Sequence, residues 1–396
     1  MKIERKERKE NGRKRIMLVT PMLHQGGFER ICVLTAKLLK DRYDVYLAVF
    51  NTQDIFYDVE GLQLIDLRLG AARGSLGKLA NICRRVRRLR QLKKELCIDI
   101  SYSFGTTANI VNVLSKGRDV TWAGIRGYSA LSDRGAHLIF CRADCVVSCT
   151  RTMEAAINSA FKTKQSRTLY NPCDLAQITK LADTRLQEET GSGPLIVSMG
   201  REDDLKGFWH LIRSFAVIKS AIADAKLMII GEGSYAEYRK LAADLGISDA
   251  VRFTGALTNP FPLLARADVY ALTSQSEGFP NALIEAMACG TPCVSVNCRT
   301  GPAEILTEHY EQYSDLNAVC EAEYGILTPV FEGEKDLEPV ITAQEEQYAQ
   351  VIIDLLRDDV KRRDYSGRAV KRAGDFGVDR YVGQLVDMIE AAGDGQ

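Results

Sequence analysis

At residues 15–50 the chain reads RIMLVTPMLHQGGFERICVLTAKLLKDRYDVYLAVF, an order of elements that decides the fold. An apolar run at 15–22 is followed by a glycine turn, an amphipathic stretch at 31–42 and a second apolar run at 43–50. Short apolar runs are typical of strands buried on both faces, and an amphipathic stretch between two of them predicts a parallel strand–helix–strand unit. The alternation continues through DISYSF, TWAGIR, CVVSCT and RTLYNP. The sequence therefore predicts an α/β fold with a doubly wound parallel sheet.

The pattern restarts after the polar stretch DTRLQEETGSG at 183–193. The expected strands PLIVSMG, KLMIIGEG, VRFTGAL, VYALTS and PCVSVN alternate with expected helices at 207–223, 234–245 and 281–289. A length of 396 residues also favours two domains over one. We expect two Rossmann-like domains joined by a hinge near 174–193. The predicted parts are a basic arm at 1–15, domains at 16–175 and 190–375, and a C-terminal segment at 376–396 whose helix covers 379–392.

Composition and charge exclude several classes of protein. The chain is 46% hydrophobic and 26% charged, which is ordinary for a globular protein with full cores and excludes a disordered chain. Lys plus Arg and Asp plus Glu number 52 each, so we expect no nucleic-acid partner. No secretory leader and no run of about 18 apolar residues is evident. We therefore expect a cytoplasmic protein.

Eleven cysteines predict reduced thiols in the core of such a protein. Cys141, Cys145 and Cys149 are spaced by four, which leaves a zinc site as an alternative. We expect a helix to end and a strand to begin within this stretch, which would separate the three thiols.

Three loops that follow expected strands are suited to phosphate. Gly26 and Gly27 permit close backbone approach beside a helix start, although a simple tight turn would look the same. In GREDDLKGF, residues 200–208, Arg201 and Lys206 can neutralise a diphosphate. The alternative for this loop is a solvated charged turn, or a carboxylate metal site formed by the EDD run. Gly231, in the turn IIGEGS at 229–234, is common in such sheets and carries little weight alone.

A fourth loop is the most informative, and it reads TSQSEGFPNALIEAMACGTP at 273–292. Glu277 follows an expected strand, and Gly278, Phe279, Pro280 and Asn281 form a turn that opens a helix. The N–H groups at such a helix start favour an anion. Glu285 lies within a helix of otherwise small and apolar residues, where a carboxylate is costly unless it is partnered or faces a cleft. The alternative is an exposed Glu285 and an ordinary turn acid at 277.

These motifs together closely resemble the retaining GT-B glycosyltransferases of family 4. The resemblance rests on SEGFPNALIEAMACGTP and GREDDLKGF, with support from GPAEIL at 301–306, YGILTPV at 324–330 and QGGFER near the start. It covers about residues 15–392 and is strongest over 195–330. It implies a GT-B fold with an interdomain cleft, an N-terminal acceptor domain, a C-terminal nucleotide-sugar domain and a last helix that crosses back to the N-terminal domain.

The resemblance also implies roles for individual residues. Arg201 and Lys206 would hold the diphosphate of a nucleotide-sugar, and Glu277 would contact the transferred sugar. Glu285 would accept hydrogen bonds from the ribose hydroxyls. Donor binding would further involve a set of loop residues from both domains, namely Gly26, Gly27, Gly231, Gly278, Phe279, Pro280 and Asn281. Many members carry a histidine near the sugar, but WAGIRGYSALSD at 122–133 has none, and Arg126 is the nearest candidate on the acceptor side.

No metal and no cofactor is expected, because two cations and a helix start can oppose the charge of the leaving diphosphate. The resemblance implies a cytoplasmic enzyme that moves a hexose or N-acetylhexosamine from a UDP-sugar to a glycan or polyprenyl-linked acceptor in surface polysaccharide synthesis. Two alternatives are a catalytically silent subunit that binds nucleotide-sugars and a GT-B phosphorylase-like enzyme, which would need a cofactor-bearing lysine.

A basic amphipathic helix is expected at 79–96, LANICRRVRRLRQLKKEL. Its apolar positions are Leu79, Ile82, Val86, Leu89, Leu92 and Leu96, and its basic positions are Arg84, Arg85, Arg87, Arg88, Arg90, Lys93 and Lys94. The apolar stripe could cover the sheet and leave a solvated cationic face. Alternatively the helix, with the basic arm at 1–15, could contact anionic lipid at the inner face of the plasma membrane.

Overall fold

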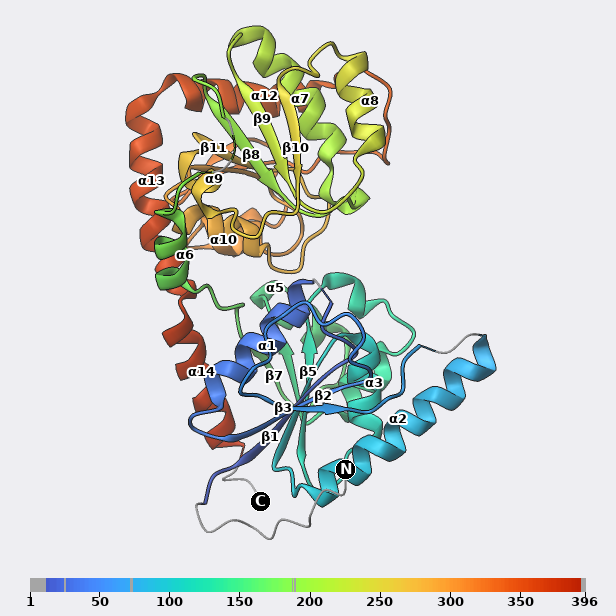
Figure 1. Cartoon of the computed structure of the whole chain (residues 1–396). Coiled ribbons are helices and arrows are strands. Elements are labelled where there is room, and N and C mark those ends of the chain that lie inside the picture. The colour runs from blue at the N-terminus through green and yellow to red at the C-terminus, as the bar shows by residue number, and fades with distance from the viewer. Residues whose placement is uncertain (1–11, 25, 72–73, 187, 189, 393–396) are drawn as a thin grey trace. The chain divides into compact units, whose positions relative to one another are not determined.

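The computed structural model describes residues 12–24, 26–71, 74–186, 188 and 190–392, which form two compact units (Figure 1). Of these residues, unit 1 contains those up to Asn171 and those from Asp379 onward, and unit 2 contains Pro172–Val378. The chain enters unit 2 just before the expected hinge, because Leu175–Ala182 form helix α6 and pack on helix α9 (Phe261–Arg266) of unit 2.

Unit 1 is built on a seven-stranded sheet whose strands are all parallel, in the order β3-β2-β1-β4-β5-β6-β7. The strands are β1 (Arg15–Thr20), β2 (Asp44–Val49), β3 (Gln63–Asp66), β4 (Ile100–Phe104), β5 (Val120–Ile125), β6 (Cys145–Ser148) and β7 (Ser166–Thr168). The helices are α1 (Gly27–Leu39), α2 (Ser75–Glu95), α3 (Thr106–Leu114), α4 (Ala136–Arg142), α5 (Arg151–Ala160) and α14 (Val378–Ala391), with a 3-10 turn at Tyr128–Leu131.

Helices cover both faces of the unit 1 sheet, because alternate residues of each strand point to opposite faces. Ile16 and Leu18 of β1 share one core with α1 and α14, whereas Met17 and Val19 share the other core with α2 and α3. Helix α14 thus completes a core formed by the first 171 residues, and Tyr381 also hydrogen-bonds Thr35 of α1 through their hydroxyls at 2.7 Å.

Unit 2 contains a second seven-stranded sheet, in the order β10-β9-β8-β11-β12-β14-β13, in which only the β13–β14 pair is antiparallel. Its strands are β8 (Leu195–Met199), β9 (Lys226–Ile230), β10 (Val251–Gly255), β11 (Val269–Leu272), β12 (Cys293–Val296), β13 (Cys320–Glu321) and β14 (Ile326–Thr328). Besides α6 and α9, its helices are α7 (Phe208–Ala221), α8 (Ala236–Asp244), α10 (Asn281–Ala288), α11 (Pro302–Leu306), α12 (Ala343–Arg357) and α13 (Asp359–Ala373), and its 3-10 turns are Asp204–Lys206, Tyr310–Tyr313 and Gly374–Phe376.

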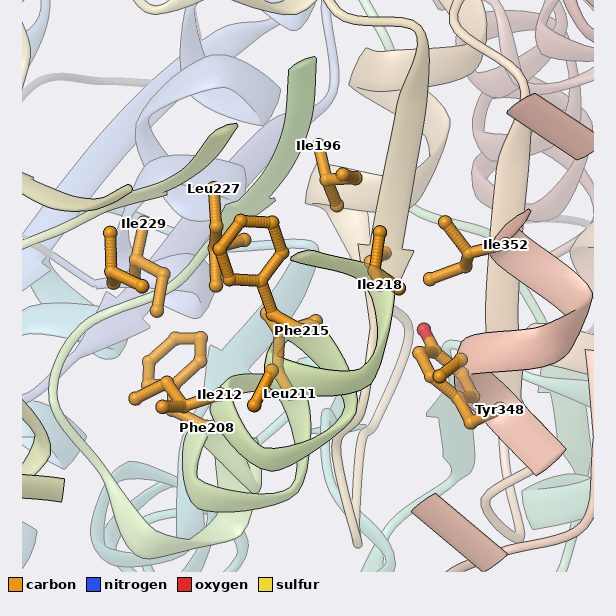
Figure 2. Packing of buried hydrophobic residues seen from close by; sticks show 14 of the residues in the cluster. Ile196, Phe208, Leu211, Ile212, Phe215, Ile218, Leu227, Ile229, Tyr348 and Ile352 are labelled. Carbon is orange, nitrogen blue, oxygen red and sulfur yellow. The ribbon is translucent and has the colours of Figure 1, made fainter. Parts of the chain in front are cut away.

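Figure 2 shows the larger core of unit 2, in which Phe208, Leu211 and Phe215 of α7 face Leu227 and Ile229 of β9. Tyr348 and Ile352 bring α12 into the same core. The predicted helices at 207–223, 234–245, 281–289 and 379–392 are confirmed to within two residues at each end.

A buried polar cluster lies at the start of α7. The Nδ1 atom of His210 lies 2.7 Å from Oε1 of Glu345, and Nη1 of Arg213 donates to the same oxygen at 3.3 Å. Arg213 also donates to the carbonyl of Asp336 at 2.7 Å. All three side chains are at most 5% exposed, so the cluster joins α7 to α12 inside unit 2.

The predicted basic arm falls mostly outside the described residues, since nothing is described before Gly12. Its last two residues are part of the fold. Lys14 donates to the carbonyl of Ile389 at 2.9 Å, and Arg15 is a buried residue of β1 that donates to the carbonyl of Leu96 at 3.0 Å.

The cysteines are all free, and six of them are buried in the cores, each at most 5% exposed. As expected, α4 ends at Arg142 and β6 begins at Cys145, which separates the thiols of the four-residue spacing. Burial raises the pKa of Cys145 to about 12 and that of Cys289 to about 12, so both stay protonated. Within the described ranges, no three His, Cys, Asp or Glu side chains form a group that could hold a metal ion.

Candidate functional site

The candidate site lies where strand order reverses in unit 2. Strand β8 is followed along the chain by β9 and β10 on one side, whereas β11 is followed by β12 and β14 on the other side. Ligands of open α/β sheets bind at the carboxyl ends of the strands at such a switch point. The loops that follow β8 and β11 therefore flank the expected position of a ligand, and they carry Arg201, Lys206 and Glu277.

Backbone and side-chain contacts hold the two loops together. The amide of Gln275 donates to the carbonyl of Leu205 at 2.8 Å, and the hydroxyl of Thr273 donates to the carbonyl of Lys206 at 3.1 Å. Gly207 adopts a left-handed φ of 61°, and a Cβ there would lie 2.3 Å from the carbonyl oxygen of Thr273. Only glycine permits this approach at this φ, so the sequence Lys206-Gly207 sets the spacing between the loops.

Lys206 and Glu277 form an ion pair, with Nζ 2.7 Å from Oε1. The Lys206 side chain is 24% exposed and that of Glu277 is 11% exposed. The stem of Lys206 runs over Gly200, where an added Cβ would lie 3.0 Å from Cε. The structure thus brings together a cation and a carboxylate that are 71 residues apart in the sequence. Both lie in loops that follow strands at the same edge of the sheet.

Arg201 is exposed, and its guanidinium lies 3.2 Å from the carboxylate of Asp203. The three acids of the EDD run point to three separate partners. Asp203 accepts from the amide of Leu205 at 3.0 Å, Asp204 pairs with Lys335 at 2.9 Å, and Glu202 accepts from the amide of Ser234 at 2.8 Å. Each acid therefore has a partner in the fold, but Arg201 and Asp204 are 70% and 68% exposed, so the turn is also largely solvated.

The loop from Glu277 to Asn281 is fixed by the segment that precedes α11. The hydroxyl of Thr300 donates to the carbonyl of Glu277, and Gly301, with φ 101°, lies so close to Pro280 that a Cβ would be 2.4 Å from its Cδ. Phe279 is buried, and its ring contacts Phe376 edge-on at 5.5 Å between centroids. Gly278 and Asn281 are half-buried, and α10 begins at Asn281 as expected. The side chain of Phe279 is thus committed to packing, and its backbone remains the part suited to a ligand.

Glu285 is 4% exposed within α10, which contradicts the alternative of an exposed face residue. Its charge and that of Glu277 act on the same neighbour. Burial raises the pKa of Tyr270 well above its usual value, and the negative charges of Glu277 and Glu285 add to the rise. Both carboxylates thus act on the same residue of β11.

Gly231 lies in the turn after β9, and its conformation is required by packing. A Cβ at this residue would lie 1.9 Å from the carbonyl oxygen of Gly200. The turns after β8 and β9 are in direct backbone contact here, and the amide of Gly200 donates to the carbonyl of Ile230 at 2.8 Å.

In unit 1, the glycine turn before α1 is held by Tyr57. The Tyr57 hydroxyl accepts from the amide of Gly26 at 2.9 Å and donates to the carbonyl of Gly26 at 2.7 Å. A Cβ on Gly26 would clash with the carboxylate of Glu29 at 2.2 Å, whereas Gly27 is exposed with nothing near its Cβ position. Gly27 is therefore the open position of this pair.

Arg126 is tied into unit 1 by two side chains. Its Nη1 donates to Oδ1 of Asn171 at 2.7 Å, and its Nη2 donates to the hydroxyl of Tyr102 at 2.6 Å. The guanidinium also lies 5.2 Å from the ring centroid of Phe104. These contacts give Arg126 a packing role next to Asn171, the last residue of the chain before unit 2.

The basic helix extends further than predicted and divides into two parts. Leu89 and Leu92 of α2 are buried against the sheet, as the sheet-covering alternative requires, but Leu76 and Leu79 are 85% and 61% exposed. Two basic residues expected on the cationic face are buried instead. Arg85 donates to the carbonyl of Leu69 at 2.8 Å and lies over the Phe50 ring, and Lys93 pairs with Asp119 at 2.9 Å.

Sequence reasoning missed three residues that support the site: Tyr57, Thr273 and Glu202. Tyr57 and Thr273 lie 31 and 67 residues from the groups they hold, and no local pattern announces such contacts. Glu202 was visible as part of the EDD run, and its position next to Arg201 was the available signal.

Replacing Gly207 by alanine is expected to lower both activity and melting temperature, because the new Cβ must displace the carbonyl of Thr273. Gly246→Ala is the matched control, since Gly246 has a similar φ of 70° and open space at its Cβ position. The control should lose only about 1 kcal/mol of stability from backbone strain. Thermal melting and donor turnover of both variants check the prediction, and equal effects of the two substitutions would contradict it.

Known proteins resemble this chain in sequence and in fold. A family model described as glycosyl transferases group 1 matches residues 183–372, which include both loops of the site. The match spans 190 of the 396 residues, just under half of the chain. An uncharacterized glycosyltransferase of Methanocaldococcus jannaschii is 29% identical to the chain over 63% of its length and 64% of the relative. The N-acetylgalactosamine-N,N'-diacetylbacillosaminyl-diphospho-undecaprenol 4-alpha-N-acetylgalactosaminyltransferase of Campylobacter jejuni is 24% identical over 89% of the chain and 93% of the relative.

Solved structures share the fold of this chain. The crystal structure of Anabaena HepE in complex with UDP superposes with a TM-score of 0.73 and 19% identity, over 95% of this chain and 100% of that one. The two α/β units thus have the GT-B fold, as the sequence predicted.

Proposed function

We propose that the chain is a retaining family 4 glycosyltransferase. It would move a hexose or N-acetylhexosamine from a UDP-sugar to a glycan or polyprenyl-linked acceptor in surface polysaccharide synthesis. The observation that carries the proposal is the Lys206–Glu277 pair at the switch point between β8 and β11. Support for the donor comes from the UDP complex of HepE, and support for a lipid-linked acceptor comes from the name of the Campylobacter relative.

In this proposal, the site opposes the charge that develops on the leaving diphosphate. Arg201 is exposed and, among the described residues, pairs with Asp203, so its guanidinium is able to turn toward a phosphate. Lys206 already lies against Glu277, and a diphosphate would share its positive charge. Glu277 would contact the transferred sugar, and buried Glu285 would bind the ribose hydroxyls. Gly27, the open position before α1, stays a predicted donor-binding residue.

Two alternative functions can be told apart from this one by experiment. A silent nucleotide-sugar-binding subunit would bind UDP and release no sugar from the donor. A phosphorylase-like enzyme would cleave a glycan with inorganic phosphate and would require a cofactor bound to lysine. The four charged residues of the proposed site favour the transferase over both.

The test is a thermal-shift screen over nucleotide-sugars followed by hydrolysis of the radiolabelled donor that stabilises the protein most. We expect a UDP-sugar to raise the melting temperature and free sugar to be released slowly. No shift with any UDP-sugar would overturn the proposal, and a shift without sugar release would favour the silent subunit.

We further propose that the reaction needs no metal ion, since two cations and the start of α10 can oppose the developing charge. Donor hydrolysis should therefore keep its rate in excess EDTA. Loss of the activity in EDTA and its return with Mg²⁺ would refute this part of the proposal.

We also propose that the first half of α2 attaches the enzyme to the inner face of the plasma membrane. Among the described residues, no helix has the length and hydropathy of a membrane span. The exposed Leu76 and Leu79 lie on the part of α2 that does not cover the sheet, and exposed or half-buried Arg84, Arg87 and Arg88 follow them. Apolar side chains beside a cationic cluster are the chemistry that anionic lipid surfaces bind.

Replacing Arg84, Arg87 and Arg88 by glutamine should weaken binding to phosphatidylglycerol vesicles. Each cation near such a surface contributes about 1 kcal/mol, so the partition coefficient should fall about a hundredfold. A matched control removes three exposed cations of unit 2, Arg357, Arg363 and Lys371, and should bind as the wild type does. Vesicle flotation at low and high salt measures the effect. Flotation that is insensitive to salt, or equal for both variants, would count against membrane attachment by α2.

A further inference from the structure

We propose that Glu202 is a positioning residue for the loop at 200–208, which carries Arg201 and Lys206. The Glu202 carboxylate holds this loop in place by occupying an anion-binding turn elsewhere in the same chain. The inference rests on the proposed function, because it assigns Glu202 the task of placing Arg201 and Lys206. Glu202 is not among the residues to which the resemblance gives a role in donor binding. The turn in question is 231–235, between β9 and α8.

The contacts of the Glu202 carboxylate carry the proposal. Its Oε2 atom accepts from the amide of Ser234 at 2.8 Å, from the amide of Tyr235 at 3.0 Å and from the hydroxyl of Ser234 at 3.3 Å. The backbone of Glu202 adds a further bond, since its amide donates to the carbonyl of Glu232 at 2.7 Å. Both the main chain and the side chain of this residue are thus committed to the turn.

The backbone of the turn is shaped around Glu202. Gly233 has a φ of 156°, and a Cβ there would lie 2.3 Å from Cβ of Glu202. Tyr235 adopts a left-handed φ of 52°, and its hydroxyl donates to the carbonyl of Gly200 at 2.8 Å. A left-handed φ is unfavourable for a tyrosine, so the bonds on both sides of this turn must outweigh its cost.

Consecutive amides that point to one anion form a concave site of the kind that binds phosphate. In this protein a carboxylate occupies that site, through hydrogen bonds that are strong because the acceptor is charged. The turn after β9 is therefore closed to a phosphate group. The diphosphate is left to the neighbouring loop, where Glu202 holds the backbone between Arg201 and Lys206.

The experiment compares UDP affinity, measured by calorimetry, with the kcat and KM of donor hydrolysis in Glu202→Ala. We expect UDP binding to weaken about tenfold and the donor KM to rise by a similar factor. Acetate at high concentration should restore both, because it can supply the missing carboxylate to the two amides. Glu202→Gln keeps an acceptor oxygen and should lie between the wild type and the alanine variant.

Glu232→Ala is the matched control, since it removes an exposed carboxylate from the same turn. It should bind UDP as the wild type does and should not respond to acetate. Wild-type UDP affinity in Glu202→Ala would overturn the inference, as would a loss in that variant that neither acetate nor the glutamine variant relieves. A wild-type protein that binds no UDP would instead overturn the proposed function.

Discussion

Lys206→Ala is expected to lower the kcat of donor hydrolysis about a hundredfold without unfolding the protein. Removing one preorganised donor to a developing negative charge costs about 3 kcal/mol of transition-state stabilisation. The substitution also leaves Glu277 without its cation at 2.7 Å, so a carboxylate that is 11% exposed would face the donor phosphates unneutralised. Steady-state kinetics with the preferred UDP-sugar measures the loss.

Lys240→Ala is the control for the loss of one positive charge in unit 2. Its side chain is 77% exposed and pairs only locally, with Asp244. This variant should turn over the donor at the wild-type rate, and circular dichroism should show both variants folded. A Lys206 variant with wild-type kcat would remove this lysine from the reaction.

Glu345→Ala is expected to lower the free energy of unfolding of unit 2 by about 3–5 kcal/mol, the usual cost of breaking a buried ion pair by removing one partner. Arg213, at 2% side-chain exposure, would keep a charge that no longer meets this carboxylate, and His210 would lose its partner at 2.7 Å. The same carboxylate accepts from the amide of Thr342 at 2.8 Å, so the first turn of α12 would also lose a cap.

Glu346→Ala provides the matched control, because Glu346 is exposed in the same first turn of α12. Urea denaturation of both variants should shift the unit 2 transition strongly for Glu345 and by less than about 0.5 kcal/mol for Glu346. Similar shifts for the two glutamates would show that the buried cluster contributes little.

The alternation of strands and helices was predictable where a strand is buried along its length, as β1 and β11 are, because such a strand reads as a continuous apolar run. The edge strand β3 is exposed or half-buried and gives no such run, so it was not predicted. The two loops of the site were also predictable, since glycines and charged residues interrupt apolar runs there. What these patterns cannot supply is a contact such as Lys206–Glu277, because it depends on β8 pairing with β11 across the reversal of strand order.

The basic helix α2 is a second case in which the sequence pattern could not predict long-range contacts. Its period placed Arg85 and Lys93 on the polar face, and the structure buries both. Their partners, the ring of Phe50 and the carboxylate of Asp119, come from other parts of unit 1, so helical periodicity alone could not find them. The exposed Leu76 and Leu79 have the opposite cause, since α2 begins beyond the part that packs on the sheet core.

The contribution of α14 to unit 1 has a consequence for how the protein is made. The first 171 residues emerge from the ribosome before α14 has been made. At that stage the apolar core on one side of the unit 1 sheet still lacks Tyr381, Leu385 and Ile389. Unit 2 is continuous in sequence and can fold while that surface is still uncovered. The nascent N-terminal unit therefore keeps that apolar surface uncovered until α14 has been synthesised, and uncovered apolar surface makes such a folding intermediate prone to aggregation.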